Sequence, residues 1–334
     1  MDMLRRIFGL GQTEPTEDTT GKESPLPQEE LDRPQKSAEF EEPVAGPFPG
    51  HSPLGGTRQL PPLETALTRP NQHIIYGQSS DVGMVRNANQ DAILTFFVSQ
   101  GNADNVPDLG LFVVADGMGG HHDGEKASAI AANVVAEQVT RKIFLPTLGQ
   151  EQEANSAEQP TVSEILVEAV KAANEVVVKS IPEGGTTITA AAVIGDLAYI
   201  VHVGDSRAYL ISKEHGPQYE IEQITRDHSL VQRLIELDQL TPDEAAQHPQ
   251  KNVLYRAIGQ SDSLEVDTIT RRLPADSYLL LCSDGLWNMV PEEKLLEAIT
   301  SAASPQLACD RLVALANEAG GSDNISAILL RVPG

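Results

Sequence analysis

The sequence predicts an α+β fold in which antiparallel strands and helices form separate groups. From about residue 72 onwards, short apolar runs of strand length mostly follow one another directly, without a helix between them. Helical patterns come in groups of their own. A doubly wound parallel sheet would instead alternate strand and helix along the chain, so antiparallel sheet with segregated helices is the better interpretation.

Nine runs have the length and apolar content of strands. In chain order they are 74–83, 92–98, 109–115, 187–194, 197–203, 206–211, 265–272, 277–283 and 324–332. Five segments show helical periodicity, and these are 125–142, 161–180, 228–238, 292–300 and 304–319. The first of these helices has an Ala-rich face suited to close packing against a sheet. The polar segment 149–160 is expected to be a loop between helices.

Composition limits the classes of partner. The chain has 334 residues, 40% of them hydrophobic, and a net charge of -24, which opposes binding to nucleic acid or to an anionic membrane over most of the surface. Cys282 and Cys309 are too few for a disulfide framework or a thiolate metal site. No run approaches the roughly 20 apolar residues of a membrane span, and no secretory signal is visible. We expect a cytoplasmic monomer.

The first 70 residues differ in composition from the rest of the chain. They contain 11 of the 22 prolines and carry 7 Lys and Arg residues against 12 Asp and Glu residues. No periodicity is sustained, so this segment cannot bury enough apolar area to offset ordering. We expect residues 1–70 to be a disordered acidic, Pro-rich tail and residues 71–334 to be one domain. The opening MDMLRRIFGLG is either an ordinary terminus or a short helix that docks on a partner or membrane.

Five aspartates stand at the ends of predicted strands. Asp116 and Asp284 each follow an apolar run and precede a glycine, whereas Asp91 and Asp323 stand just before a run. Asp205 lies in the short connection between two runs. A single aspartate at a strand end is ordinary turn chemistry. Five such positions are expected to converge, because the ends of neighbouring strands meet in space.

Converging carboxylates repel one another unless a cation neutralises them. All five side chains are oxygen donors, which favours Mg²⁺, Mn²⁺ or Ca²⁺ over zinc or copper. The spacing of an EF-hand loop is absent. A two-ion hydrolytic site fits better, because two cations can hold a bridging water, lower its pKa and stabilise an in-line displacement. Gly117 suits such a site, since a residue without a side chain lets its carbonyl oxygen approach a cation.

A phosphate ester is the natural substrate for a site of this kind, and its charge needs a cationic partner. Arg86 precedes Asp91 by five residues on the same segment. Its planar guanidinium group matches the oxygen atoms of a phosphate. We therefore expect Arg86 to bind substrate phosphate, and the alternative is a surface arginine paired with local acids.

Seven motifs carry a resemblance to a known family. In chain order they are SDVGMVRNANQDA (80–92), VVADGMGGHHDGE (113–125), GGTTITAAAVI (184–194), VHVGDSRAYLI (201–211), TRDHSLVQRLIELDQLTPDEAAQHPQKNVLYRAIG (225–259), LLLCSDGLWNMV (279–290) and GGSDNISAILL (320–330). They resemble the metal-dependent Ser/Thr protein phosphatases, the protein phosphatase 2C-like (PPM-type) family in its bacterial form. The resemblance covers about residues 72–332.

The resemblance implies a four-layer α/β/β/α sandwich of two antiparallel sheets flanked by helices. It also implies two Mg²⁺ or Mn²⁺ ions. Asp116 would bridge them, Gly117 would offer its carbonyl to one, and Asp284 with Asp323 would complete the ligands of the other. Asp91 would bind an ion or the water that an ion holds.

Three further roles follow from the resemblance. Asp205, with Asp284, would match a weaker third metal position of the bacterial members. Arg86 would bind the substrate phosphate. The segment 212–252 would be a flap beside the active site that influences substrate choice.

His121 is left with two interpretations of equal weight. Met118 stands where eukaryotic members carry a histidine proposed as general acid, and His121 follows three residues later. With an unperturbed pKa near 6.5, His121 could protonate the leaving alkoxide. The alternative is an exposed loop histidine. We further expect Asp227 and His228 to cap the flap helix, and His202 and Cys282 to be buried core residues.

These observations predict a metal-dependent phosphatase for phosphoserine and phosphothreonine in proteins, opposed by a Ser/Thr kinase. One rival is a catalytically silent module that binds phosphoproteins, which the loss of metal ligands would mark. The other is a phosphatase-like regulator of a sigma-factor pathway that acts on one small partner.

Overall fold

The two sheets that the sequence predicts are present. A computed structural model describes residues 73–99, 107–119, 123–149, 160–214 and 216–334. The predicted tail, residues 1–70, lies outside the described residues. Among the helices that are described, none combines the length and the apolar character that crossing a bilayer requires.

All strand pairings in the described residues are antiparallel, as predicted. One sheet has the order β1-β11-β10-β7-β8, and the other has the order β2-β3-β5-β6-β9, with β4 paired to β3 beside that path. In chain order the strands are β1 Ile75–Asp81, β2 Asp91–Val98, β3 Leu109–Met118, β4 Gly185–Thr186, β5 Ile188–Ile194, β6 Leu197–Val203, β7 Arg207–Ser212, β8 Glu220–Gln223, β9 Asp267–Arg272, β10 Ser277–Cys282 and β11 Ile325–Val332.

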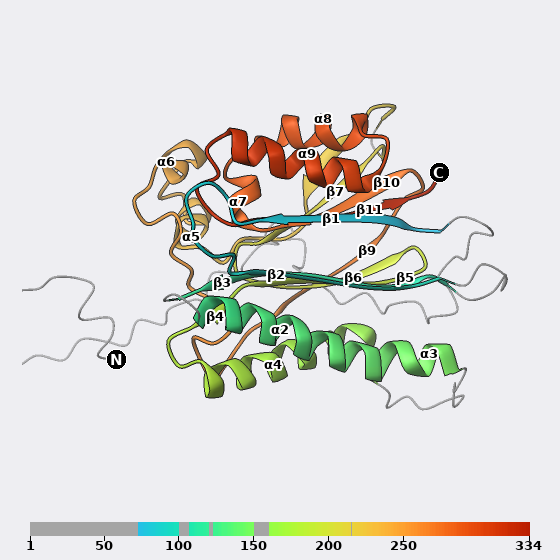
Figure 1. The fold of residues 1–334 in the computed structure, drawn as a ribbon, viewed down its shortest axis with the longest axis horizontal. Coiled ribbons are helices and arrows are strands. Elements are labelled where there is room, and N and C mark those ends of the chain that lie inside the picture. Colours follow the sequence, from blue (N-terminus) through green and yellow to red (C-terminus); the bar gives the residue numbers. More distant parts are fainter. Residues whose placement is uncertain (1–72, 100–106, 120–122, 150–159, 215) are drawn as a thin grey trace, which may run out of the picture. The chain divides into compact units, whose positions relative to one another are not determined.

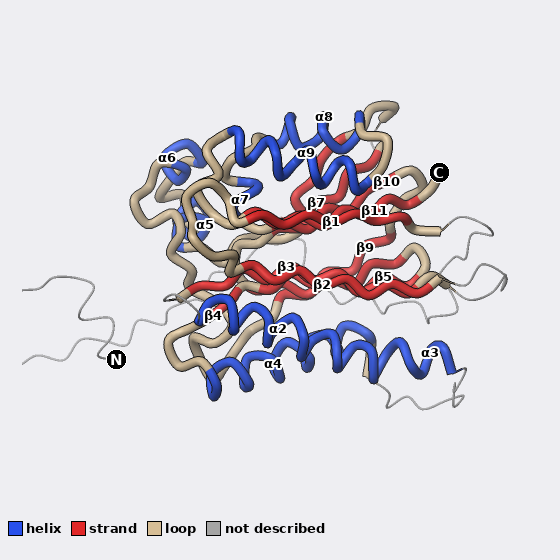
Figure 2. Tube along the Cα trace, viewed as in Figure 1, coloured by secondary structure: helices blue, strands red, loops and turns tan. Residues whose placement is uncertain are grey.

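Helices cover the outer face of each sheet, which gives the four layers seen in Figures 1 and 2. Helices α2 and α4 pack on the β2-β3-β5-β6-β9 sheet, and α8 and α9 pack on the other sheet. The helices are α2 Asp123–Val139, α3 Leu145–Gly149, α4 Val162–Ser180, α5 Leu230–Glu236, α6 Pro242–Ala246, α7 Asp284–Trp287, α8 Glu292–Ser301 and α9 Pro305–Glu318, and a π-helical turn spans Thr140–Phe144.

The central strands are apolar throughout because both of their faces are covered. Along β3, Leu111 and Val113 pack in the layer shared with α2 and α4. The alternate residues, Phe112 and Val114, pack between the two sheets. Successive side chains of a strand point to opposite faces, so a strand buried on both faces reads as a continuous apolar run.

Local capping sets where the long helices begin. Thr161 accepts a hydrogen bond from the Glu164 amide, and the Glu164 carboxylate accepts one from the Thr161 amide, so α4 starts with a capping box. Ser304 caps α9 in a similar way through the Leu307 amide, directly before Pro305 at the first helical position.

The connection between β7 and β9 contains the segment expected to be a flap, residues 212–252. Its first part is not separate from the sandwich, because β8 pairs with β7 and extends that sheet. The short helices α5 and α6 form the remainder, and sequence periodicity missed both β8 and α6. Strand β4 and helix α7 were also missed, since two and four residues are too short for periodicity to show.

Candidate active site

The five predicted aspartates lie at strand ends that come together in the structure. Asp91 begins β2 and stands opposite Asp116 of β3 in the antiparallel register. Asp284 starts α7 directly after β10, and Asp323 stands just before β11. Asp205 lies in the turn from β6 to β7. The negative charges of the other four all act on the Asp116 carboxyl group, so the structure brings the five predicted residues together.

Hydrogen bonds position Asp91 and Asp116 from neighbouring strands. The Ser283 hydroxyl donates to Asp91 Oδ2 at 2.7 Å, which ties the start of β2 to the end of β10 in the other sheet. The Asp116 amide donates to Thr187 Oγ1 at 2.9 Å, and the Asp116 carbonyl accepts from Thr186 Oγ1 at 2.8 Å. The main chain of Asp116 is therefore held by its neighbours, and its carboxylate is left to face the acidic centre.

Burial raises the pKa of four of these carboxyl groups. It is the largest cause of the raised pKa of Asp91, about 6, and of Asp284, about 7, and repulsion from Asp323 adds to both. Burial also raises the pKa of Asp116 and Asp205 well above the usual range, and repulsion from neighbouring carboxylates adds to it. Such a group of buried acids is stable in its charged form only beside a compensating positive charge.

Within the described residues, two oxygen atoms of the centre have no hydrogen-bond partner. Asp91 Oδ1 and Asp284 Oδ1 are buried and unpaired in the part of the chain that the structure describes. A buried acceptor without a donor is costly, so these atoms suit a cation with oxygen ligands. The donor set contains no thiolate at this point, which fits Mg²⁺ or Mn²⁺ better than softer metals.

The carboxylates do not form a closed ligand group as they stand. Among the described residues, no three His, Cys, Asp or Glu side chains are arranged closely enough to hold one ion. The charges of the same aspartates nonetheless act on one another, and two of their oxygen atoms are unpaired within the described residues. Uncompensated carboxylates repel one another and are expected to stand apart, and Asp323 is also turned to a partner, Arg86.

Glycine follows Asp116 and Asp284 because another backbone comes close at each position. A Cβ atom on Gly117 would lie 2.2 Å from the Gly124 carbonyl oxygen at the start of α2. A Cβ atom on Gly285 would lie 2.0 Å from the Asn324 carbonyl oxygen before β11. No side chain fits at such distances, so the two Asp-Gly pairs allow segments distant in sequence to meet at the acidic centre.

Arg86 contacts the acidic centre directly. Its Nη2 donates to Asp323 Oδ2 at 2.6 Å, with half of the Arg86 side chain exposed. That hydrogen bond is the largest influence raising the pKa of Arg86, and the charges of Asp284 and Asp116 act in the same direction. Arg86 thus pairs with a local acid, as the alternative interpretation expected, but that acid is itself a predicted metal ligand.

Asp205 is held through its main chain by a tryptophan. Trp287 Nε1 donates to the Asp205 carbonyl oxygen at 3.0 Å, and the Arg207 guanidinium lies 3.5 Å above the Trp287 ring. Arg207 also forms an ion pair with Asp227 at 2.8 Å, with 18% and 5% of the two side chains exposed. A largely buried ion pair, Arg207–Asp227, therefore packs against the tryptophan that holds Asp205, and the sequence did not predict it.

Two predicted helix caps are wrong. Helix α5 is capped by Ser229, which accepts a hydrogen bond from the Gln232 amide. Asp227 instead binds Arg207, and His228 binds Asp267 at 3.2 Å. Asp, His and Ser stand side by side in the sequence, and only the three-dimensional position of charged partners decides which of them is free to cap.

The predicted core residues behave as expected, and one predicted site residue cannot be placed. His202 is fully buried, with Nδ1 2.9 Å from Thr189 Oγ1 and Nε2 3.0 Å from the Arg226 carbonyl oxygen. Burial lowers the pKa of His202 to about 3, so it is a neutral core residue. Cys282 is buried as well. His121 lies outside the described residues.

Ser283 and Asn324 organise the centre and were not predicted from the sequence. Asn324 Oδ1 accepts from the Gln90 amide at 2.8 Å, and its Nδ2 donates to the carbonyl oxygens of Val82 and Ala88. It therefore holds the loop that carries Arg86. The one feature of the sequence that could have indicated these two residues is their position, since Ser283 and Asn324 are each adjacent to one of the predicted aspartates.

Several known proteins are similar to this chain in sequence and in fold. Residues 85–318 match the family model described as protein phosphatase 2C. The chain is 35% identical over 251 residues to the serine/threonine phosphatase stp of Listeria monocytogenes serotype 4b (strain F2365), covering 75% of this chain and 93% of that protein. The solved serine/threonine phosphatase of S. agalactiae is 31% identical, with a TM-score of 0.65 over 78% of this chain and 100% of the other. The catalytic domain of PstP, solved with 2 manganese ions, is 30% identical, with a TM-score of 0.61 over 78% and 99% of the two chains.

This chain belongs to the protein phosphatase 2C family. The predicted family, the predicted sandwich of two antiparallel sheets flanked by helices, and the predicted class of enzyme, a protein-serine/threonine phosphatase, are confirmed.

Proposed function

We propose that the chain removes phosphate from phosphoserine and phosphothreonine in proteins with the help of two divalent cations, Mg²⁺ or Mn²⁺. The observation that carries this proposal is the pair of buried, unpaired oxygen atoms, Asp91 Oδ1 and Asp284 Oδ1, within the described residues. Divalent cations with oxygen ligands are the partners such atoms require. The relative PstP, solved with 2 manganese ions, is consistent with this choice.

The proposed ligands are the residues of the acidic centre. Asp116 would be shared by the two ions, and Gly117 would offer its carbonyl oxygen to one of them. Asp284 and Asp323 would hold the other, and Asp91 would bind an ion or the water that an ion holds. Ions at these carboxylates would supply a deprotonated water and neutralise charge on the phosphoryl oxygens. In addition, Asp205 with Asp284 is proposed for a weaker third position.

Arg86 is the proposed phosphate-binding residue. Its guanidinium is half-exposed and already points to the acidic centre through Asp323. A guanidinium has five N–H donors, so Arg86 can hold two phosphate oxygens while one N–H remains on Asp323. Binding in this way orients the ester and stabilises the charge that develops on the phosphoryl oxygens.

No covalent phosphoenzyme is needed. Burial raises the pKa of the Cys282 thiol to about 12, so this cysteine beside Asp284 stays protonated and is a poor nucleophile. For the leaving group, we propose His121 as proton donor, with an exposed loop histidine as the alternative. The test is a His121→Ala variant. Slower hydrolysis of an alkyl phosphate, with unchanged hydrolysis of p-nitrophenyl phosphate, whose leaving group needs little protonation, would support His121 as the general acid.

The proposed partners are phosphorylated proteins and the Ser/Thr kinase that modifies them, with the phosphatase acting as a monomer. The alternative function, a catalytically silent module that binds phosphoproteins, would be marked by the loss of metal ligands. All five aspartates and Gly117 are present in the sequence.

The central test is Mn²⁺-dependent hydrolysis of p-nitrophenyl phosphate by the Asp116→Asn and Asp284→Asn variants. We expect loss of activity in both, with an unchanged circular dichroism spectrum. Full activity in either variant would refute the metal assignment. A phosphothreonine peptide as second substrate then separates a protein phosphatase from a phosphatase for small esters.

A further inference from the structure

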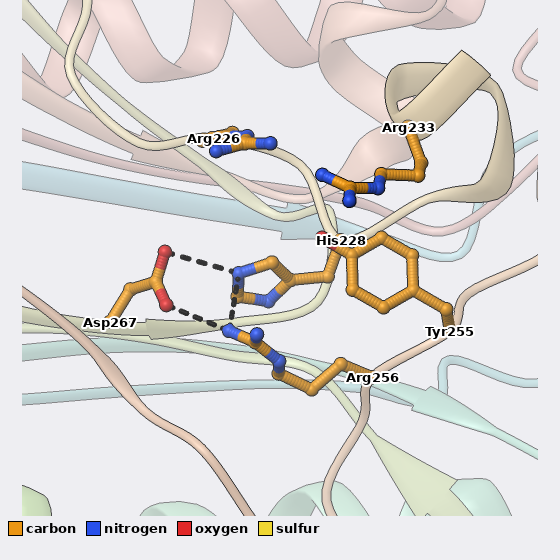
Figure 3. A pocket seen from close by; sticks show the side chains of 6 residues that line it. All are labelled: Arg226, His228, Arg233, Tyr255, Arg256 and Asp267. Atoms are coloured by element: carbon orange, nitrogen blue, oxygen red, sulfur yellow. Dashed lines mark hydrogen bonds and ion pairs between the residues drawn. The ribbon is translucent and has the colours of Figure 1, made fainter. Parts of the chain in front are cut away.

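A pocket of about 510 Å³ lies apart from the acidic centre, between the segment around α5 and the start of β9. None of the candidate metal ligands lines it. Its walls are polar and mostly cationic (Figure 3), and its lining residues are Arg226, His228, Arg233, Tyr255, Arg256 and Asp267. The lining therefore contains three guanidinium groups and one carboxylate, in a chain with a net charge of -24.

Two of the arginines form a pair on one wall of the pocket. Arg226 and Arg233 both contact the same carboxylate, Glu236, which is not part of the lining. The two side chains are 53% and 55% exposed, whereas Glu236 is 21% exposed. One carboxylate cannot use the ten N–H donors of two guanidinium groups. Among the described residues, this wall therefore has one positive charge in excess and N–H groups available for a further acceptor.

On the opposite wall, the one guanidinium group is paired with two carboxylates. The Arg256 guanidinium binds Asp267 at 2.7 Å and Glu265 at 2.8 Å. His228 Nδ1 accepts a hydrogen bond from the Gly204 amide, and its Nε2 lies 3.0 Å from Arg256 Nη1 and 3.2 Å from Asp267 Oδ2. That contact with His228 is the main reason that the pKa of Asp267 falls to about 2. The Asp267 carboxylate is thus occupied by its own neighbours, and the two contacts that Arg226 and Arg233 share are with Glu236.

The pocket connects to the acidic centre through one turn of backbone. The His228 amide donates to the Gly204 carbonyl oxygen at 2.7 Å, and the Gly204 amide donates back to His228 Nδ1 at 3.0 Å. Gly204 is followed by Asp205, a member of the acidic centre. The wall of the pocket and the acidic centre are therefore joined by a short hydrogen-bonded turn.

We propose that this pocket is an anion subsite that binds a second phosphate group of the phosphoprotein substrate, close in sequence to the phosphate that is hydrolysed. Paired guanidinium groups match the several oxygen atoms of a phosphate dianion better than the two of a carboxylate. Tyr255, 47% exposed at the pocket, adds a hydroxyl donor. This inference rests on the proposed function and extends it to substrates that carry two neighbouring phosphates.

The test compares three peptides with one phosphothreonine and a variable position near it, occupied by Ala, Glu or a non-hydrolysable phosphonate analogue of phosphoserine. We expect the phosphonate to lower KM about tenfold relative to Ala, the effect of one well-formed charge-assisted hydrogen bond. The kcat should stay unchanged, since the second anion adds binding without entering the reaction. Arg233→Gln should abolish the difference between the phosphonate and Ala peptides.

Matched variants keep the test independent of folding. Arg233→Lys keeps the positive charge but loses the planar guanidinium that donates two parallel hydrogen bonds, so it should retain part of the effect. Arg311→Gln, a change at a distant half-exposed arginine of α9, should retain all of it. Hydrolysis of p-nitrophenyl phosphate, which is too small to reach the pocket, should be equal in all variants.

The outcomes distinguish this inference from the proposed function. Equal KM values for the phosphonate and Ala peptides, or equal responses of the Arg233→Gln and Arg311→Gln variants, would overturn the subsite. Equal KM values for the phosphonate and Glu peptides would overturn its assignment to phosphate. Failure of the wild-type protein to hydrolyse p-nitrophenyl phosphate and the Ala peptide would instead contradict the proposed function.

Discussion

Asp91 and Asp116 stand directly opposite each other on the neighbouring antiparallel strands β2 and β3. Like charges at directly opposed positions destabilise a sheet, and both carboxyl groups are buried with raised pKa values. Two opposed aspartates therefore destabilise the sheet, whereas Ile93 and Val114, further along the same pair of strands, form an apolar pair that stabilises it. The arrangement is explained if a cation is bound by the two carboxylates.

The stability of the metal-free protein should fall as the pH rises. Folding raises the pKa of Asp284 from 3.8 to about 7 and that of Asp91 to about 6. The folded state therefore binds more protons than the unfolded state between about pH 4 and pH 7, and stability is lost across that window. Urea unfolding in EDTA at about pH 5 and pH 7.5 measures this.

Two controls accompany the pH experiment. Asp284→Asn removes one of the repelling charges and should stabilise the metal-free protein at neutral pH by roughly 2 kcal/mol while abolishing activity. Added Mg²⁺ should restore stability to the wild type only, by an amount that grows with its concentration relative to Kd. A metal-free stability that does not change with pH would contradict the buried acidic centre.

Arg86→Ala should impair catalysis far more than folding. Loss of a charge-assisted contact with the phosphate should reduce kcat/KM for p-nitrophenyl phosphate about 10- to 100-fold. The ion pair with Asp323 is half-exposed, so the free energy of unfolding should change by less than about 1 kcal/mol. Arg86→Lys should keep part of the activity, because the ammonium group keeps the positive charge but cannot donate two parallel hydrogen bonds. Unchanged kcat/KM in Arg86→Ala would show that this arginine only pairs with Asp323.

The fluorescence of Trp287 should report on metal binding. It is the only tryptophan in the chain, and its Nε1 donates to the Asp205 carbonyl oxygen at 3.0 Å. An ion that binds beside Asp205 changes the field at the indole, so titration with Mg²⁺ should shift or change the emission. Asp205→Asn should weaken the response at high Mg²⁺ while leaving the response of the first two ions. A signal that is the same in the Asp205→Asn variant would argue against a third position there.

Breaking the Arg207–Asp227 ion pair should be strongly destabilising. With 18% and 5% of their side chains exposed, the two residues are poorly solvated, and Asp227→Asn would leave the buried guanidinium of Arg207 without its counter-charge. The expected loss is about 3 kcal/mol by urea unfolding. The matched control is Arg141→Ala, which removes an exposed pair with Glu137 and should cost under about 0.5 kcal/mol. Equal losses in the two variants would contradict the role given to this buried pair.

The main strands and helices could be identified from the sequence because their signals are local and repeated. Strand β3 was recognised from its continuous apolar run, and α4 from its periodicity. Strand β8 and helix α7 were missed, because four residues stabilised by a neighbouring strand or a preceding loop carry no period of their own. The cap of α5 was assigned to Asp227 rather than Ser229 for a related reason, since Asp227 is taken by an arginine from another strand.

The sequence by itself determined the fold class, the family motifs and the convergence of five aspartates, because apolar runs, strand ends and Asp-Gly pairs are properties of single segments. Only the tertiary structure decided how those segments meet. The ion pair of Arg86 with Asp323 spans 237 residues, and the bond from Ser283 to Asp91 spans 192. The cationic pocket around Arg226 and Arg233 likewise depends on a shared carboxylate. Arg233 and Glu236 are three residues apart on one helix, but the contacts of Arg86 and Ser283 join segments far apart in the chain, so no local pattern could have identified those two.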